Sequence, residues 1–267
     1  MSTATHNSIS KQLPKQGATI DFRQLLRDFT AQTNHNPQLL RWNAALDRED
    51  GANIRVALLD SGINLLHPSL KGAHLHTRDF THSGGVFDRT GHGTKGAILL
   101  VGQNYLRGIA PACTLLVGKV LGTGNSDRSA IALAQGIRWA IAEGAQVIIL
   151  PLGRQQTSPL VKQSILQALA KNCQIFAAAG NFGADICLFP ARLFGVIAVS
   201  AVDLSGVPLS GCCQNSQVDC YAPGKDIFPS HLAGGSSING SSAATVVAAG
   251  VAALEIASAA YQETSAL

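Results

Sequence analysis

Short, continuous apolar runs alternate with segments of helical spacing along most of this chain. A strand that is apolar at every position is buried on both faces, which is typical of parallel sheets. Parallel strands need long crossover connections, and these are usually helices. The pattern therefore predicts an α/β fold with a mostly parallel central sheet and helices on both faces. The predicted strands are 54–59, 115–120, 147–150, 175–179 and 196–201, and the predicted helices include 129–143, 158–171 and 241–260.

The first 50 residues differ from the rest because they are polar and irregular. Only two short helices are expected there, over 21–30 and 37–46. No internal repeat or low-complexity linker divides the remainder. The sequence therefore predicts an N-terminal extension over 1–50 and a single main domain over 51–267.

The composition is that of a globular protein with a large aliphatic core. Hydrophobic residues make up 46% of the chain and charged residues 13%, which argues against intrinsic disorder. The net charge is +4, but the 20 Lys and Arg residues form no run, so no nucleic-acid partner is expected. The N-terminal segment lacks the apolar core of a signal peptide, and the longest apolar stretches are too short to span a bilayer. We therefore expect a cytoplasmic protein without a membrane segment.

Three short runs place an Asp, a His and a Ser in this order. Asp60 follows a predicted strand, His92 opens a predicted helix between two glycines, and Ser242 lies in the first turn of the closing helix. A serine hydroxyl is a poor nucleophile at neutral pH, so it needs a base to take its proton and an anion to orient that base. The three residues supply these parts, and the glycines beside His92 are expected to leave room for a substrate backbone.

Asn181 is a fourth candidate because it follows the strand predicted over 175–179. Its side-chain amide would donate a hydrogen bond to the oxyanion of a tetrahedral intermediate, beside the backbone N–H of Ser242. Each candidate also has a simpler interpretation. Asp60 and Asn181 suit turns, His92 suits a core or surface position, and Ser241 or Ser242 suits a helix cap. The combination and its order favour a serine hydrolase.

Six segments make the chain resemble the subtilases, the subtilisin-like serine proteases. They are 56–63 around Asp60, 91–94 around His92, 108–111, 178–181 around Asn181, 221–224 and 240–245 around Ser242. The resemblance runs from about residue 53 to 254 and implies a three-layer subtilisin-like fold. It also implies a peptidase domain that hydrolyses peptide bonds through an acyl-enzyme. By this match Ser242, rather than Ser241, is the nucleophile, and Asp60, His92 and Asn181 complete the catalytic set.

The same resemblance implies a substrate-binding site whose small, apolar residues form a roomy pocket for the side chain before the scissile bond. These residues are Pro151, Leu152, Gly153, Ala178, Ala179 and Gly180. The chain departs from the family where Pro151 removes a backbone donor. Arg154 and Phe182 replace smaller or acidic residues, which leaves the substrate preference open. The loop 102–106 lacks the Asn cluster of the family's calcium loop, so no calcium is expected there.

The sequence thus predicts a serine endopeptidase that processes peptides or proteins in the cytoplasm, without a cofactor or metal. The resemblance also suggests a likeness to cytoplasmic subtilases that trim ribosomally made peptides, including the cyanobactin maturation proteases. One alternative is a catalytically silent peptide-binding pseudoprotease, motivated by Pro151 and by Val246 in place of a common Pro. Another is a macrocyclase or transpeptidase that passes the same acyl-enzyme to an amine.

Two further hypotheses belong to other classes of site. A nucleotide-binding loop is suggested by 122–124, but Asp127 stands where G-x-G-x-x-G needs its last glycine. Three of the six cysteines, Cys212, Cys213 and Cys220, are clustered. They lack a CxxC pair and an adjacent His, so free buried thiols are favoured over a zinc site.

Overall fold

The computed structural model describes residues 20–33, 37–122, 126–227 and 238–265. Its centre is a seven-stranded sheet in the order β3-β5-β2-β6-β7-β8-β9, and every neighbouring pair is parallel. The strands are β2 (Arg55–Asp60), β3 (His74–Asp79), β5 (Thr114–Lys119), β6 (Val147–Leu150), β7 (Gln174–Ala178), β8 (Ile197–Val202) and β9 (Cys220–Pro223). The five strands expected from apolar runs are therefore confirmed, and β3 and β9 are additional.

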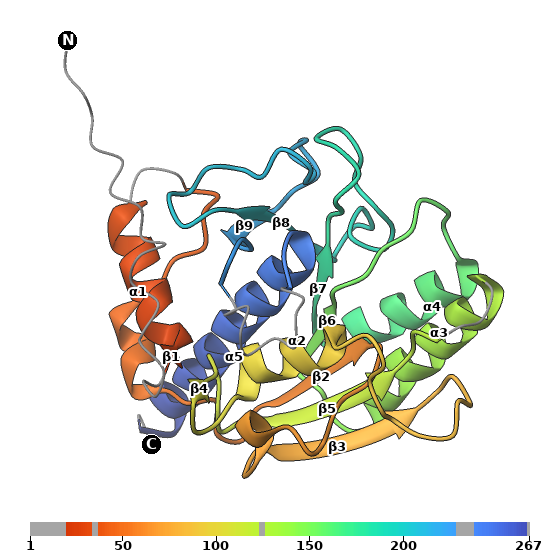
Figure 1. Cartoon of the computed structure of the whole chain (residues 1–267), viewed down its shortest axis with the longest axis horizontal. Coiled ribbons are helices and arrows are strands. Elements are labelled where there is room, and N and C mark those ends of the chain that lie inside the picture. The colour runs from red at the N-terminus through yellow and green to blue at the C-terminus, as the bar shows by residue number, and fades with distance from the viewer. Residues whose placement is uncertain (1–19, 34–36, 123–125, 228–237, 266–267) are drawn as a thin grey trace.

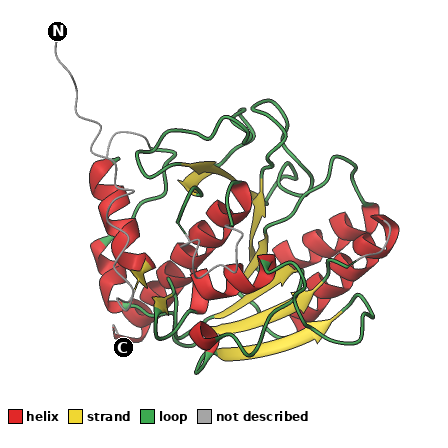
Figure 2. Ribbon diagram, in the orientation of Figure 1, coloured by secondary structure: helices red, strands yellow, loops and turns green. Residues whose placement is uncertain are grey.

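Helices cover both faces of the sheet, as Figures 1 and 2 show. One face carries α2 (His92–Val101) and α5 (Ser241–Ser265), and the other carries α3 (Ser126–Ala142) and α4 (Pro159–Leu169). Strand side chains alternate between two cores, because successive residues point to opposite faces. Val56 and Leu58 pack with α2 and α5, whereas Ala57 and Leu59 pack on the side of α3 and α4. The three-layer α/β fold is confirmed.

The helix α5 crosses the middle of the protein. The sequence leads us to expect no apolar stretch long enough to span a bilayer, but the helical segment Ser241–Ala260, with a mean hydropathy of 1.8, is long and apolar enough by length and composition. However, 72% of that window is buried within the protein, where it packs against α2 and strands β6 to β9. Burial in the core thus accounts for its apolar character, and its first turn lies at the edge of the sheet where the strands end (Figure 1).

The described part of the first 50 residues packs on this body. The helix α1 (Phe22–Gln32) is capped by Asp21, which confirms the helix expected over 21–30. β1 (Ile20–Asp21) pairs in parallel with β4 (Leu106–Arg107). Phe22 and Leu26 belong to the core that α5 completes. The boundary near residue 50 remains a prediction.

The helix expected over 37–46 is wrong. The structure has a single 3₁₀ turn, η2 (Ala44–Arg48), and Leu39 instead forms a parallel bridge with Tyr221. Tertiary contacts set this conformation, because the guanidinium of Arg23 lies 5.3 Å from the centre of the Trp42 ring and donates to the Leu46 carbonyl at 2.7 Å.

Candidate active site

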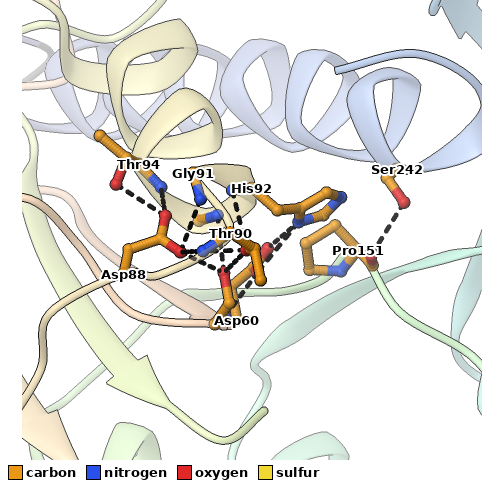
Figure 3. Close-up of polar contacts among 10 residues, drawn as sticks. Asp60, Asp88, Thr90, Gly91, His92, Thr94, Pro151 and Ser242 are labelled. Atoms are coloured by element: carbon orange, nitrogen blue, oxygen red, sulfur yellow. Dashed lines mark hydrogen bonds and ion pairs between the residues drawn. The ribbon is translucent and has the colours of Figure 1, made fainter. Parts of the chain in front are cut away.

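Asp60 and His92 meet at the carboxyl edge of the sheet. Asp60 is the last residue of β2 and His92 the first of α2, and His92 Nδ1 lies 2.9 Å and 2.8 Å from the two Asp60 carboxylate oxygens. The Asp60 side chain is 1% exposed, whereas the imidazole is 33% exposed. A carboxylate at Nδ1 favours the tautomer with its proton there, which leaves Nε2 as an acceptor. The ring extends from α2 on the side of Ser242 (Figure 3).

The charges around His92 favour its protonated form. Burial by itself lowers the pKa of His92, but the hydrogen bond to Asp60 and the charges of Asp60 and Asp88 outweigh burial. The pKa is therefore raised above its ordinary value of 6.5. A base with such a pKa is suited to taking a proton near neutral pH or slightly above it.

Ser241 and Ser242 occupy different environments at the start of α5. Ser241 is fully buried, and its hydroxyl donates to Asn181 Oδ1 at 3.0 Å and accepts the Gly180 N–H at 3.2 Å. Ser242 is half-buried, and its hydroxyl donates to the Pro151 carbonyl at 2.9 Å (Figure 3). No hydrogen bond joins Ser242 to His92 in the described part of the chain. Ser242 alone of the two serines is accessible to a substrate.

Asn181 lies beside the first turn of α5 with its amide orientation fixed by acceptor contacts. Its Oδ1 accepts from the Ser241 backbone N–H at 2.9 Å, from the Ser241 hydroxyl and from the Cys212 thiol at 3.1 Å. A backbone N–H can donate only to an acceptor, so these contacts identify the amide atom of Asn181 that faces Ser241 as the oxygen and not the nitrogen. The two Nδ2 hydrogens therefore point away from Ser241. The side chain is exposed, so this NH₂ group is available to a ligand.

Gly93, which follows His92, is required by the close packing of α2 and not, as expected, by space for a substrate. A Cβ on Gly93 would lie 2.3 Å from the Gly62 carbonyl oxygen and 3.1 Å from Asp60 Cβ. Gly93 thus lets α2 approach the Asp60 loop closely, rather than making room for a substrate. Gly240 is constrained in the same way, because its φ is +82° and a Cβ there would lie 2.6 Å from Asn181 Oδ1.

Asp88 is a site residue that the sequence analysis missed. One carboxylate oxygen accepts from the Ser61 hydroxyl, from the Gly91 N–H and from both donors of Thr90. The other accepts the Thr94 N–H at 2.8 Å and its hydroxyl at 2.7 Å. Asp88 therefore fixes the start of α2, from which His92 projects, to the residue after Asp60 (Figure 3). Its only sequence signal is an Asp a few residues before a helix start.

We predict that Asp88→Asn destabilises the fold. The amide replaces one accepting oxygen with a donor, so buried N–H and O–H groups lose partners at about 1–3 kcal/mol each. Burial raises the pKa of Asp88, but its hydrogen bonds outweigh burial and hold it below 3.8. The ionised carboxylate therefore stabilises the fold above that ordinary value, and this contribution is lost as pH falls through the folded-state pKa. Urea unfolding at pH 7 and at decreasing pH measures the effect.

A turn on the surface provides the control for Asp88. Asp203 accepts the backbone N–H groups of Ser205 and Val207 in a partly exposed turn, so Asp203→Asn should cost much less. Equal losses of unfolding free energy in the two variants would contradict a special role for Asp88.

The residues predicted to bind substrate lie at the ends of two adjacent strands. Pro151 to Gly153 follow β6, whereas Ala178 ends β7 and Ala179 and Gly180 follow it, and these strands pair at Leu150 and Ala177. The buried side chain of Leu188 lies against both Gly153 and Gly180, where the sequence leads us to expect a roomy pocket. Phe182, next to Asn181, is 65% exposed.

The cysteine cluster and the suggested nucleotide loop are the two other sites that the sequence raises. All six cysteines are free thiols, and burial raises the pKa of Cys220 to about 12. Within the ranges described, no group of three or more His, Cys, Asp and Glu side chains could hold a metal ion. Residues 123 and 124 of the suggested nucleotide loop 122–124 lie outside the described residues.

The family model described as the subtilase family matches residues 51–266. The chain belongs to the subtilase family. Subtilases are subtilisin-like serine proteases, and thus hydrolases, so the resemblance found in the sequence is confirmed together with the fold.

Three relatives show how close this subtilase is to known proteins. It is 34% identical over 211 residues to M-protease of Shouchella clausii (strain KSM-K16), covering 76% of the chain and 54% of M-protease. It is 30% identical over 191 residues to the major intracellular serine protease of Bacillus subtilis (strain 168), covering 67% of the chain and 60% of that protein. The solved structure of patellamide maturation protease PatA matches with a TM-score of 0.66 and 33% identity, covering 76% of this chain and 78% of that one. The chain therefore spans little more than half the length of the first two relatives.

Proposed function

We propose that this subtilase is a serine endopeptidase that hydrolyses peptide bonds through an acyl-enzyme on Ser242. The observation that carries the proposal is the pair of a buried Asp60 carboxylate and a partly exposed His92 ring, which extends on the side of the accessible Ser242 hydroxyl at the start of α5 (Figure 3). Asp60 orients the imidazole, His92 is the general base, and Asn181 is a donor to the oxyanion.

The chemistry requires one movement of the Ser242 side chain. Rotation about χ1 takes the hydroxyl from the Pro151 carbonyl towards His92, and staggered rotamers make such a change accessible. His92 Nε2 then takes the hydroxyl proton while Oγ bonds to the substrate carbonyl carbon. The carbonyl oxygen becomes an anion, which the Asn181 Nδ2 group and the Ser242 backbone N–H stabilise. His92 returns the proton to the leaving amine, and water releases the acyl group by the same steps.

The segment after β6 offers an edge for the substrate backbone. Among the described residues, Leu152 and Gly153 make no backbone hydrogen bond, although Arg154 pairs with Phe189 in both directions. An extended peptide added beside such an edge gains backbone hydrogen bonds. Pro151 has no N–H, so this edge lacks one donor at the position closest to Ser242.

The names of two similar proteins support a substrate class and a location. One is by name an intracellular serine protease, and another is by name a patellamide maturation protease. On this basis we propose that the enzyme processes peptides or proteins in the cytoplasm.

A peptide-binding pseudoprotease is the second candidate. It is favoured by the hydrogen bond of Ser242 to Pro151, since a hydroxyl held there is not activated by His92. This candidate predicts that peptides bind and are not cleaved during long incubation.

Covalent labelling decides between the two candidates. A fluorophosphonate probe reacts with an activated serine, so we expect wild-type protein to be labelled and peptide mapping to locate the adduct on Ser242. Equal labelling of wild type and Ser242→Ala would remove Ser242 from the nucleophile role. Absence of labelling in wild type, with retained peptide binding, would favour the pseudoprotease.

We predict that Asn181→Ala lowers kcat for peptide hydrolysis by about 10²–10³-fold with little change in KM, because it removes a donor that acts on the oxyanion. Asn181→Asp is the matched variant. It keeps an acceptor for the Ser241 N–H but loses the NH₂ group, so it should lose activity while retaining stability. Near-wild-type kcat in the Asp variant would contradict the assigned role. Initial rates and thermal melts measure both effects.

A further inference from the structure

Two backbone segments frame the space beside the nucleophile. The Pro151 carbonyl accepts the Ser242 hydroxyl at 2.9 Å, and the Gly180 N–H donates to the adjacent Ser241 hydroxyl at 3.2 Å. Both segments therefore flank the first turn of α5, one at the end of β6 and one at the end of β7. A residue that acylates Ser242 would therefore lie next to both segments.

Leu188 already occupies this space. A Cβ on Gly153 would lie 2.8 Å from Leu188 Cβ and 2.9 Å from its Cδ1, and a Cβ on Gly180 would lie 2.8 Å from its Cγ and 3.0 Å from its Cδ1. Leu188 thus contacts the backbones of both walls. Its side chain is 3% exposed, so its isobutyl group forms the buried floor between them.

Backbone hydrogen bonds hold Leu188 in this position. Its N–H donates to the Ala179 carbonyl at 2.8 Å, which ties it to the wall that follows β7. The next residue, Phe189, pairs with Arg154 through bonds of 2.8 Å and 2.9 Å, which ties it to the wall that follows β6. Moving Leu188 aside would break contacts to both walls, and a packed interior resists such a displacement.

We propose that Leu188 closes the pocket for the side chain before the scissile bond and restricts cleavage to peptides with Gly, Ala or Ser at that position. This inference rests on the proposed endopeptidase function. The walls consist of Pro151 to Gly153 and Ala178 to Gly180, and their small residues would leave space for a large side chain if Leu188 were absent. Leu188 is therefore the residue that determines specificity within this pocket.

The test is a cleavage profile of a diverse peptide library, read by mass spectrometry. We expect wild type to cleave mainly after Gly, Ala and Ser. A difference of one methylene in a pocket changes kcat/KM by about 10–200-fold, so Leu188→Ala should raise kcat/KM for Leu, Met and Phe by at least about tenfold. Cleavage after Ala should change far less. Efficient wild-type cleavage after Phe, or an unchanged profile in Leu188→Ala, would overturn the inference.

A matched leucine controls for general loosening of the fold. Leu169 ends α4, and a Cβ on Gly195 would lie 2.8 Å from its Cδ1, so Leu169→Ala removes the same atoms from a similar contact elsewhere. This variant should keep the wild-type profile, and a shift equal to that of Leu188→Ala would overturn the inference. If Leu188→Ala does not fold, Leu188→Val should shift the profile in the same direction to a smaller extent. An unchanged profile in a folded Leu188→Val would also overturn it.

Fluorophosphonate labelling separates this inference from the function on which it rests. Labelled protein that cleaves without preference for small residues would overturn the role of Leu188 and leave the endopeptidase intact. Wild-type protein that is neither labelled nor active would overturn the endopeptidase, and the specificity inference with it.

Discussion

Replacing Ser242 with alanine is expected to lower kcat for peptide hydrolysis by about 10⁶-fold, the size of effect known for the nucleophile of the related subtilisin. The hydroxyl is the group that forms the acyl-enzyme, and no neighbouring side chain replaces it. Ser241 is buried behind it, and its hydroxyl is engaged by Gly180 and Asn181. Initial rates on a peptide that the wild type cleaves, together with binding of that peptide, measure the loss.

Ser241→Ala is the matched control, because it deletes the same hydroxyl one residue away. We expect this variant to remain active but to unfold more easily by about 1–3 kcal/mol, since the buried Gly180 N–H loses its acceptor. If Ser242→Ala stays active and Ser241→Ala does not, the assignment of the nucleophile is wrong.

From its apolar runs the sequence predicted five strands of the seven-stranded sheet, and it missed β3 and β9. The run 54–59 appears as β2 with a shift of one residue, because nearly every side chain of β2 is buried. The edge strand β3 escaped notice, since its sequence HLHTRD alternates exposed and half-buried side chains. Its pairing with β5 is a tertiary contact that local apolar character does not reveal.

The site residues that lie at the end of a strand or the start of a helix could be predicted from the sequence. Those whose role depends on contacts between segments distant in sequence could not. The proximity of Asp60 and His92 follows from a strand end and a helix start that meet at one edge of the sheet. Asp88 becomes significant only through its contacts with Ser61 and Thr94. The sequence does not single out Leu188, because its position between Gly153 and Gly180 depends on three segments that are distant in sequence.

The pH dependence of hydrolysis should follow the His92 ring. The base must be neutral to take the Ser242 proton, so kcat/KM is expected to rise with pH through the pKa of His92, above 6.5. The sign for stability is opposite. Because the folded-state pKa is raised, protonated His92 stabilises the fold below about pH 6.5, and this contribution is lost as pH rises through the folded pKa.

Asp60→Asn is expected to lower kcat by about 10⁴-fold, a loss known for the equivalent change in another Ser-His-Asp protease. The Asn amide donates to Nδ1, so the proton moves to Nε2, and the imidazole can no longer accept the Ser242 proton. The same change removes the charge and the acceptor that raise the pKa of His92, while burial continues to lower it. The rising limb of the pH profile should therefore shift to lower pH.

Asp88→Asn is the informative comparison, because Asp88 raises the pKa of His92 by its charge without touching Nδ1. It should shift the limb in the same direction and leave most of kcat in molecules that remain folded. A 10⁴-fold loss in both variants, on the order of that expected for Asp60 alone, would show that scaffold disruption, rather than the tautomer of His92, controls the rate.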